Sequence, residues 1–181
     1  MEHAVPGPVQ GYWVVPGRFL AGEYPAHDGT AEAAGRLDAL LSAGIDTFVD
    51  LTQPDELISY LPLLEQRASL LGLRIHWRRF PIRDLGLPIR SDMHATLDYI
   101  DISLAAGQNV YVHCWGGVGR TGLVVGCFLV RHGRTGIQAL EQISQWRRDM
   151  PNRVYSPRSP ETPEQVQFVL DWFEHMVPAR S

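Results

Sequence analysis

The chain has 181 residues, the size of one ordinary domain, and this length can bury a hydrophobic core without metal or disulfide support. A formal net charge of -4 and a pI near 5.9 argue against a broad basic surface for nucleic acid or an anionic membrane. Two cysteines, Cys114 and Cys127, are too few for a disulfide framework, and the N-terminal residues lack the charged start and apolar run of a signal peptide. We therefore expect a reduced, cytoplasmic protein that binds neither nucleic acid nor membrane.

The first half of the chain predicts strands that alternate with helices. Tyr12 to Val15 and Arg18 to Ala21 flank a Pro-Gly turn and predict a β-hairpin. Two later segments have apolar residues at helical spacing and end at a glycine, and each is followed by a segment typical of a strand. These segments are helices over residues 30–43 and 61–71 and strands over residues 47–51 and 73–80.

The second half begins with a loop, Pro81 to Arg90, that carries two prolines and a glycine. A helix over residues 91–106, a strand over residues 109–113, an apolar helix starting at Thr121 and helices over residues 136–149 and 163–176 are predicted after it. Alternating strands and helices predict a single α/β domain with a central, mostly parallel mixed sheet flanked by helices. The ligand site of such a fold lies at the carboxyl ends of the strands.

The segment His113 to Gly122 reads HCWGGVGRTG and connects a predicted strand to a helix. Glycines allow the positive φ angles and close approach that fold a short loop into a cup of backbone N–H groups, and the helix adds the positive end of its dipole. Such a cup holds a tetrahedral oxyanion. Cys114 lies at its floor, where amides and dipole favour the thiolate over the thiol. Arg120 can close over the rim, because its planar fork matches two phosphate oxygens.

HCWGGVGRTG resembles the His-Cys-x5-Arg-Thr/Ser loop of the protein tyrosine and dual-specificity phosphatases. PIRDLGLP at Pro81 to Pro88 looks like the general-acid loop of that family. WVVPGRFLAGEYP is similar to the N-terminal hairpin of bacterial and cell-cycle-type members, and PETPEQVQF resembles a glutamine-bearing segment of some relatives. The resemblance implies a phosphotyrosine phosphatase-like catalytic domain over residues 9–178, after a flexible segment of residues 1–8.

The resemblance implies hydrolysis of phosphotyrosine, with phosphoserine and phosphothreonine as further candidate substrates, through a phosphocysteine intermediate. Cys114 attacks phosphorus while Asp84 protonates the leaving oxygen, and Asp84 then acts as base when water hydrolyses the intermediate. Thr121 would donate a hydrogen bond to the thiolate, and His113 would order the loop through its ring. No metal or cofactor is implied.

Further residues receive roles from the same resemblance. The residues implied to bind phosphate are Trp115, Gly116, Gly117, Val118, Gly119 and Arg120. Glu161 and Gln165 stand where relatives often place a water-positioning glutamine. The Trp115 ring is unusual in such a loop, and two placements stay open for it, in the pocket wall or packed under the loop.

Several of these residues also have ordinary structural interpretations. Cys127 is expected to be a core residue of the apolar helix rather than a redox partner. An aspartate in a proline-bounded loop commonly makes only a turn, so Asp92 and Asp55 are fallback acids for Asp84.

Other functions fit parts of the pattern. A phosphoinositide phosphatase would carry lysines between Cys114 and Arg120, and none is present there. Low-molecular-weight phosphatases and arsenate reductases place the cysteine before the acid, the reverse of the order here. A sulfurtransferase of rhodanese type would need neither Asp84 nor Thr121, and a non-catalytic phosphate-binding module would usually have lost the cysteine, the arginine or the acid.

The expected partner is a phosphoprotein or a small aryl phosphate, bound by a monomer. Arg153 and Arg158 lie in a proline-rich stretch near the C-terminus. Two interpretations stay open for them, an ordinary solvated surface or a contact with a phosphoprotein.

Overall fold

One mixed β-sheet forms the centre of the computed structural model, which describes residues 8–26 and 30–173. Its strands are β1 (Gly11–Val15), β2 (Phe19–Gly22), β3 (Thr47–Asp50), β4 (His76–Arg79) and β5 (Val110–His113), in the order β1-β2-β5-β3-β4. β1 pairs antiparallel with β2, and every other neighbouring pair is parallel. The predicted hairpin and the mostly parallel mixed sheet are both confirmed.

The central strand β5 leads into the site. Its last residue, His113, lies opposite Gly22 of β2 and Asp50 of β3, so the carboxyl ends of three parallel strands meet at one edge. Every residue of these three strands is buried, as expected when helices cover both faces of a parallel sheet. Cys114 follows His113 directly and therefore emerges at the edge where α/β sheets bind their ligands.

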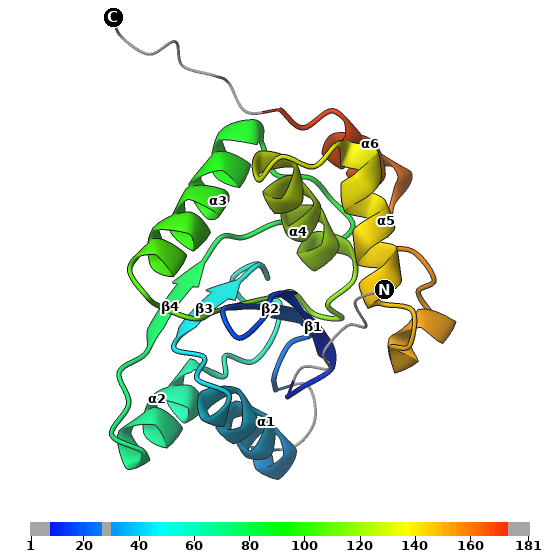
Figure 1. Ribbon diagram of the computed structural model, residues 1–181. Coiled ribbons are helices and arrows are strands. Elements are labelled where there is room, and N and C mark those ends of the chain that lie inside the picture. The colour runs from blue at the N-terminus through cyan, green and yellow to red at the C-terminus, as the bar shows by residue number, and fades with distance from the viewer. Residues whose placement is uncertain (1–7, 27–29, 174–181) are drawn as a thin grey trace, which may run out of the picture.

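Helices cover both faces of the sheet. They are α1 (Thr30–Ser42), α2 (Leu61–Leu70), α3 (Arg90–Ala105), α4 (Gly119–Arg131), α5 (Gly136–Trp146) and α6 (Pro163–Leu170), with a 3-10 helix, η1, at Pro151–Val154. α1 and α2 lie on one face and α3 to α6 on the other (Figure 1). Phe48 of β3 packs in the core on the first side and Val49 in the core on the second, because successive strand residues point to opposite faces.

Several element ends differ from the sequence prediction. β4 is shorter than its predicted strand because β3, with which it pairs, offers four residues for pairing. α4 begins at Gly119 rather than Thr121, so Gly119 and Arg120 belong to its first turn. The prediction was wrong at the end of α5, which stops at Trp146 before the chain turns into η1.

α6 ends at Leu170, short of the predicted end at residue 176. Residues 174–176 of that prediction, and residues 1–7 of the predicted flexible segment, lie outside the described residues. In the described ranges, no helix combines the length and the apolar character needed to cross a bilayer.

Candidate active site

Cys114 lies at the bottom of a loop between β5 and α4. We call residues 114–120 the anion cup. The Cys114 side chain is buried, with 3% of the residue exposed. The three strands that end at this edge and the first turn of α4 hold the cysteine where the helix dipole is positive.

The carbonyl groups of the anion cup are turned away from its centre. Trp115, Gly116 and Val118 accept hydrogen bonds on their carbonyl oxygens from Tyr24 N (2.8 Å), Asn152 Nδ2 (3.1 Å) and Ser159 Oγ (2.7 Å), respectively. No N–H group of residues 115–120 donates to any other part of the described chain. N–H groups without an internal acceptor are what an anion site requires, so the loop is compatible with the predicted binding of phosphate, which stays a prediction.

Gly117 shows why the cup needs glycine. Its φ of +68° is in the left-handed region, and a Cβ at this position would lie 2.5 Å from the carbonyl carbon of Gly22. Any side chain would therefore push the loop away from the end of β2.

Arg120 is buried against two carboxylates. Its Nη1 and Nη2 each donate to Glu56 at 2.8 Å. Nη1 also donates to the carbonyl of Ile82 (3.2 Å), and Nη2 lies 3.0 Å from Asp84 Oδ1. The Nε–H group has no hydrogen-bond partner among the described residues. A phosphate can therefore take the edge formed by Nε and Nη2, provided that Asp84 leaves Nη2.

Glu56 is a candidate site residue that sequence reasoning missed. Burial is the largest single influence on the Glu56 carboxyl and opposes its ionisation. The hydrogen bond from Arg120, a hydrogen bond from the backbone of Gln53 and the charge of Arg120 together outweigh it and lower the pKa of Glu56 below its ordinary value. The pKa of Arg120 is raised in turn: burial is the largest influence and lowers it, but the Glu56 hydrogen bond and the charges of Cys114, Glu56 and Asp84 together outweigh burial. A signal was available, since the pair Asp55-Glu56 follows β3 at the edge where Cys114 emerges.

The imidazole of His113 is held on both sides. Its Nδ1 lies 3.3 Å from the carbonyl oxygen of Cys114 and its Nε2 lies 2.7 Å from the hydroxyl of Tyr60. Burial lowers the pKa of His113 and keeps the ring neutral. A carbonyl can only accept, so Nδ1 carries the proton and Nε2 accepts from Tyr60. This arrangement fits the predicted role of His113 in ordering the loop.

Two other residues of this segment are placed by the fold. Thr121 is fully buried, and its hydroxyl donates to the carbonyl of Gly22 at 3.4 Å. Its bond to the Cys114 thiolate therefore stays a prediction. The Trp115 residue is 55% exposed, so its ring lies on the surface beside the cup and does not pack underneath it.

Asp84 is the candidate acid that reaches Arg120. It lies on the loop Pro81 to Arg90, here called the acid loop, with a side chain that is 64% exposed. Of the fallback acids, Asp55 lies in the connection between β3 and α2, and Asp92 lies in the first turn of α3. Neither pairs with Arg120 in the described chain.

Gln165 joins three parts of the site. Its Oε1 accepts from the backbone N–H groups of Glu161 (3.1 Å) and Thr162 (3.3 Å), at the start of α6. Its Nε2 donates to the carbonyl of Gly86 in the acid loop at 3.0 Å. A Cβ on Gly119 would lie 3.2 Å from Gln165 Oε1, so the same amide also lies against the anion cup.

Glu161 lies beside the anion cup too. A Cβ on Gly119 would be 3.1 Å from Glu161 Oε2. Glu161 is exposed, whereas Gln165 is fully buried. Only Glu161 of this pair is therefore accessible to water.

Cys127 is fully buried in α4, which confirms its prediction as a core residue. Within the described ranges, no group of three His, Cys, Asp or Glu residues could hold a metal ion.

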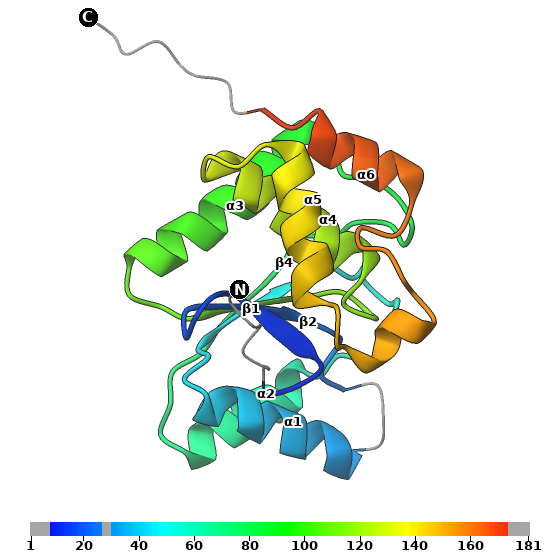
Figure 2. The same cartoon turned by 45° about the vertical axis from the view of Figure 1, so that its right-hand side comes forward.

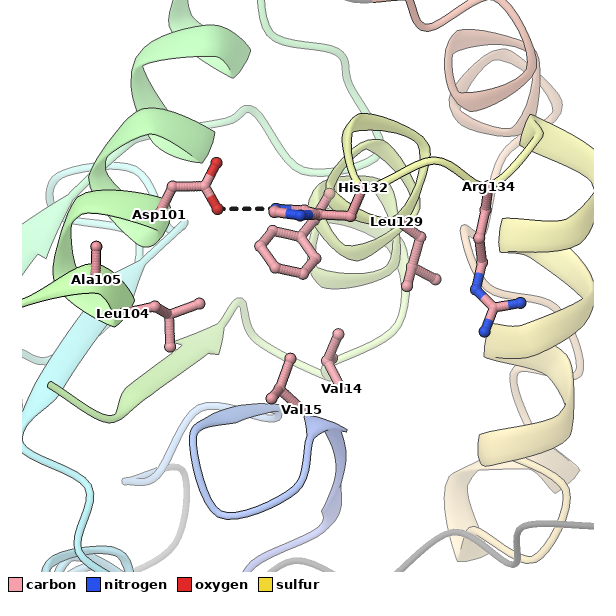
Figure 3. A pocket seen from close by; sticks show the side chains of 9 residues that line it. Val14, Val15, Asp101, Leu104, Ala105, Leu129, His132 and Arg134 are labelled. Atoms are coloured by element: carbon pink, nitrogen blue, oxygen red, sulfur yellow. Dashed lines mark hydrogen bonds and ion pairs between the residues drawn. The ribbon is translucent and has the colours of Figure 1, made fainter. Parts of the chain in front are cut away.

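A cavity of about 620 Å³ lies at the C-terminal end of α4, away from the anion cup. Figure 3 shows Asp101 and His132 paired above it and Val14 and Val15 below it. α4 has 13 residues, and a helix of that length separates this cavity from the anion cup by about 20 Å. The cavity therefore takes no part in chemistry at Cys114.

The fold and the anion cup together define the class of cysteine-dependent protein tyrosine and dual-specificity phosphatases. A family model described as "Polymorphic toxin system, DSP-PTPase phosphatase" matches residues 24–134, more than half of the chain. The chain belongs to this family.

Similar proteins agree with that assignment. The chain is 27% identical over 91% of its length to a protein of Invertebrate iridescent virus 3 named as tyrosine phosphatase 067L, and 29% identical over 99% of its length to protein tyrosine phosphatase domain-containing protein 1 of Mus musculus. It spans 65% and 23% of these relatives' own lengths, respectively. The crystal structure of Tk-PTP in its active form superposes with a TM-score of 0.68 at 25% identity, covering 88% of this chain and 93% of that one.

Proposed function

We propose that the protein hydrolyses phosphotyrosine monoesters, and phosphoserine and phosphothreonine monoesters more slowly, through a phosphocysteine intermediate on Cys114. The observation that carries the proposal is the anion cup. Its Cys114 is buried, the N–H groups of residues 115–120 have no acceptor in the described chain, and two hydrogen bonds to Glu56 hold Arg120. Aryl phosphates are favoured because their leaving group is better. The exposed Trp115 ring offers an aromatic surface to the phenyl ring of a bound phosphotyrosine.

In the first step the phosphate enters the anion cup and takes the Nε–Nη2 edge of Arg120. Asp84 is displaced from Nη2, and its carboxyl group becomes free to approach the leaving oxygen. The Cys114 thiolate forms the S–P bond while the P–O bond breaks, and Asp84 in its acid form gives its proton to the leaving oxygen. The amides and Arg120 stabilise the charge on the equatorial oxygens.

In the second step water attacks phosphorus and the S–P bond breaks. Asp84, now a carboxylate, takes a proton from that water. We assign the orientation of this water to Glu161, whose carboxylate lies beside Gly119 and is accessible. The amide of Gln165 is engaged with Gly86 and the start of α6, so we assign it to holding the acid loop near the cup. Thr121 would assist departure of the thiolate.

We further propose that the enzyme acts as a monomer in a reducing, cytoplasmic environment on phosphoproteins or small aryl phosphates. Neither Cys114 nor Cys127 is in a disulfide, and this supports the reducing environment.

The direct test is phosphate release from 4-nitrophenyl phosphate in buffer with a chelator, between about pH 5 and 8, comparing the protein with Cys114→Ser. Turnover by the wild type and none by the variant would support the proposal. Equal activity of both proteins, or formation of thiocyanate from thiosulfate and cyanide without phosphate release, would contradict it.

A further inference from the structure

The cavity at the C-terminal end of α4, here called the distal cavity, lies outside the catalytic machinery. Its volume of about 620 Å³ is within the range of about 300–1,000 Å³ that is typical of pockets for small organic molecules. β1, α3 and α4 supply most of its walls, and Figure 2 shows α3 and α4 on the same side of β1, opposite α1 and α2. The apolar residues that line it are Val14, Val15, Leu104, Ala105, Phe128 and Leu129.

The distal cavity has an apolar floor and an exposed mouth. Val14, Phe128 and Leu129 line the floor, and each of them is less than a tenth exposed. Ala105 and Arg134 are exposed and stand at the mouth. A ligand with an apolar body can therefore bury that body on the floor and keep a polar group at the mouth.

A β-bulge turns two successive residues of β1 toward the distal cavity. Successive strand residues normally point to opposite faces of a sheet. Trp13 pairs with Leu20 and Val15 pairs with Phe19, so the register shifts at Val14. Val14 and Val15 both line the cavity, and Figure 3 shows their side chains next to each other below it. Bulges re-aim side chains at functional sites, so the geometry of β1 supports a binding site here.

The charges at the mouth favour an anionic ligand. The Asp101 carboxylate is already engaged, with Oδ1 2.9 Å from His132 Nε2 and Oδ2 accepting from Arg131 Nη1 at 3.2 Å. Arg134 forms no side-chain hydrogen bond or ion pair with a described residue. Figure 3 shows Asp101 and Arg134 on opposite sides of the cavity. A carboxylate beside Arg134 would therefore gain a charged partner and stay away from Asp101.

We propose that the distal cavity binds a small amphipathic carboxylate with an aromatic body. The body would lie on the floor made by Val14, Phe128 and Leu129, and the carboxylate would pair with Arg134. An aromatic body is favoured because the rings of Phe128 and His132 already pack together, with centroids 4.3 Å apart, and a third ring can extend that contact. This site is separate from phosphate hydrolysis and does not rest on the proposed function.

The test measures the binding of 2-naphthoate by isothermal titration calorimetry. The matched probe 2-naphthylmethylammonium has the same ring system and the opposite charge. The wild type should bind the carboxylate about tenfold more tightly than the ammonium, which is the usual size of one charge-assisted contact. Both titrations are repeated with excess inorganic phosphate at matched ionic strength, because a carboxylate bound in the anion cup would be displaced by phosphate.

Two variants locate the bound probe. Arg134→Gln should weaken binding of 2-naphthoate about tenfold and leave binding of the ammonium unchanged. Ala105→Trp fills the mouth from an exposed position and should weaken binding of both probes. The matched controls are Arg148→Gln and Ala106→Trp, which change exposed residues outside the cavity and should bind like the wild type. Turnover of 4-nitrophenyl phosphate should stay the same in all four variants.

Several results would overturn the proposal. They are the absence of 2-naphthoate binding, equal affinity for the two probes, displacement of 2-naphthoate by phosphate, and wild-type binding in Arg134→Gln or Ala105→Trp. A loss in Arg148→Gln or Ala106→Trp as large as in its partner variant would also contradict it. Failure of the proposed function is a separate outcome, because the binding measurements involve no turnover and keep their meaning if 4-nitrophenyl phosphate is not hydrolysed.

Discussion

Replacing Glu56 with glutamine tests whether this carboxylate holds Arg120 in the geometry that binds phosphate. Glu56 accepts two hydrogen bonds of 2.8 Å from the guanidinium, and its side chain is 22% exposed, so solvent weakens the pair only in part. Glutamine keeps one acceptor oxygen and turns an NH2 group toward the other Nη. One hydrogen bond to a charged group is therefore lost, which costs about 1.5–3 kcal/mol.

Two measurements follow from that cost. The free energy of unfolding in urea should fall by about 1–3 kcal/mol. Misplacement of Arg120 should lower kcat/KM for 4-nitrophenyl phosphate by about 10- to 100-fold and weaken inhibition by inorganic phosphate in parallel. Glu65→Gln, an exposed glutamate on α2, is the matched control and should leave both quantities unchanged.

The result that would refute the reasoning is a Glu56→Gln protein with the expected loss of stability but kcat/KM within about twofold of the wild type. Glu56 would then stabilise the fold without positioning Arg120. Equal losses in Glu65→Gln would point to a general effect of the charge change.

Three further predictions concern the acid loop and the buried histidine. Asp84→Asn should lower kcat by about 10²- to 10⁴-fold with little change in KM, and unchanged turnover of an ester with a poor leaving group would exclude Asp84 as the acid. Gln165→Leu removes the hydrogen bond to Gly86 in the acid loop, so it should lower the rate of hydrolysis of phenyl phosphate about tenfold more than that of 4-nitrophenyl phosphate. The same extra loss in an Asp84→Asn background would contradict action through the acid loop. Burial lowers the pKa of His113 in the folded protein, so near pH 6.5 the histidine of the unfolded chain binds a proton while the folded histidine stays neutral. The free energy of unfolding in urea should therefore be highest above about pH 6.5 and fall as the pH drops below it. This fall should persist in His76→Gln, an exposed control, and disappear in His113→Gln.

The sequence determined the local parts of this protein. Cys114 and Arg120 lie six positions apart on one short loop, and glycine spacing, the preceding strand and the following apolar helix are all read over a few residues. The alternation of strands and helices predicted a mostly parallel sheet, and the position of Cys114 after β5 predicted its place at the carboxyl edge. These features depend on backbone conformation and hydrophobic periodicity, which neighbouring residues fix.

The tertiary structure decided which distant side chains complete the site. Glu56 meets Arg120 across 64 positions, and Gln165 meets Gly86 across 79. The contacts of Asn152 and Ser159 with the anion cup depend on α5 ending at Trp146 and on the chain returning past the cup before α6 begins. No periodic pattern marks such contacts, because each depends on how loops from separate strands and helices are brought to one edge of the sheet.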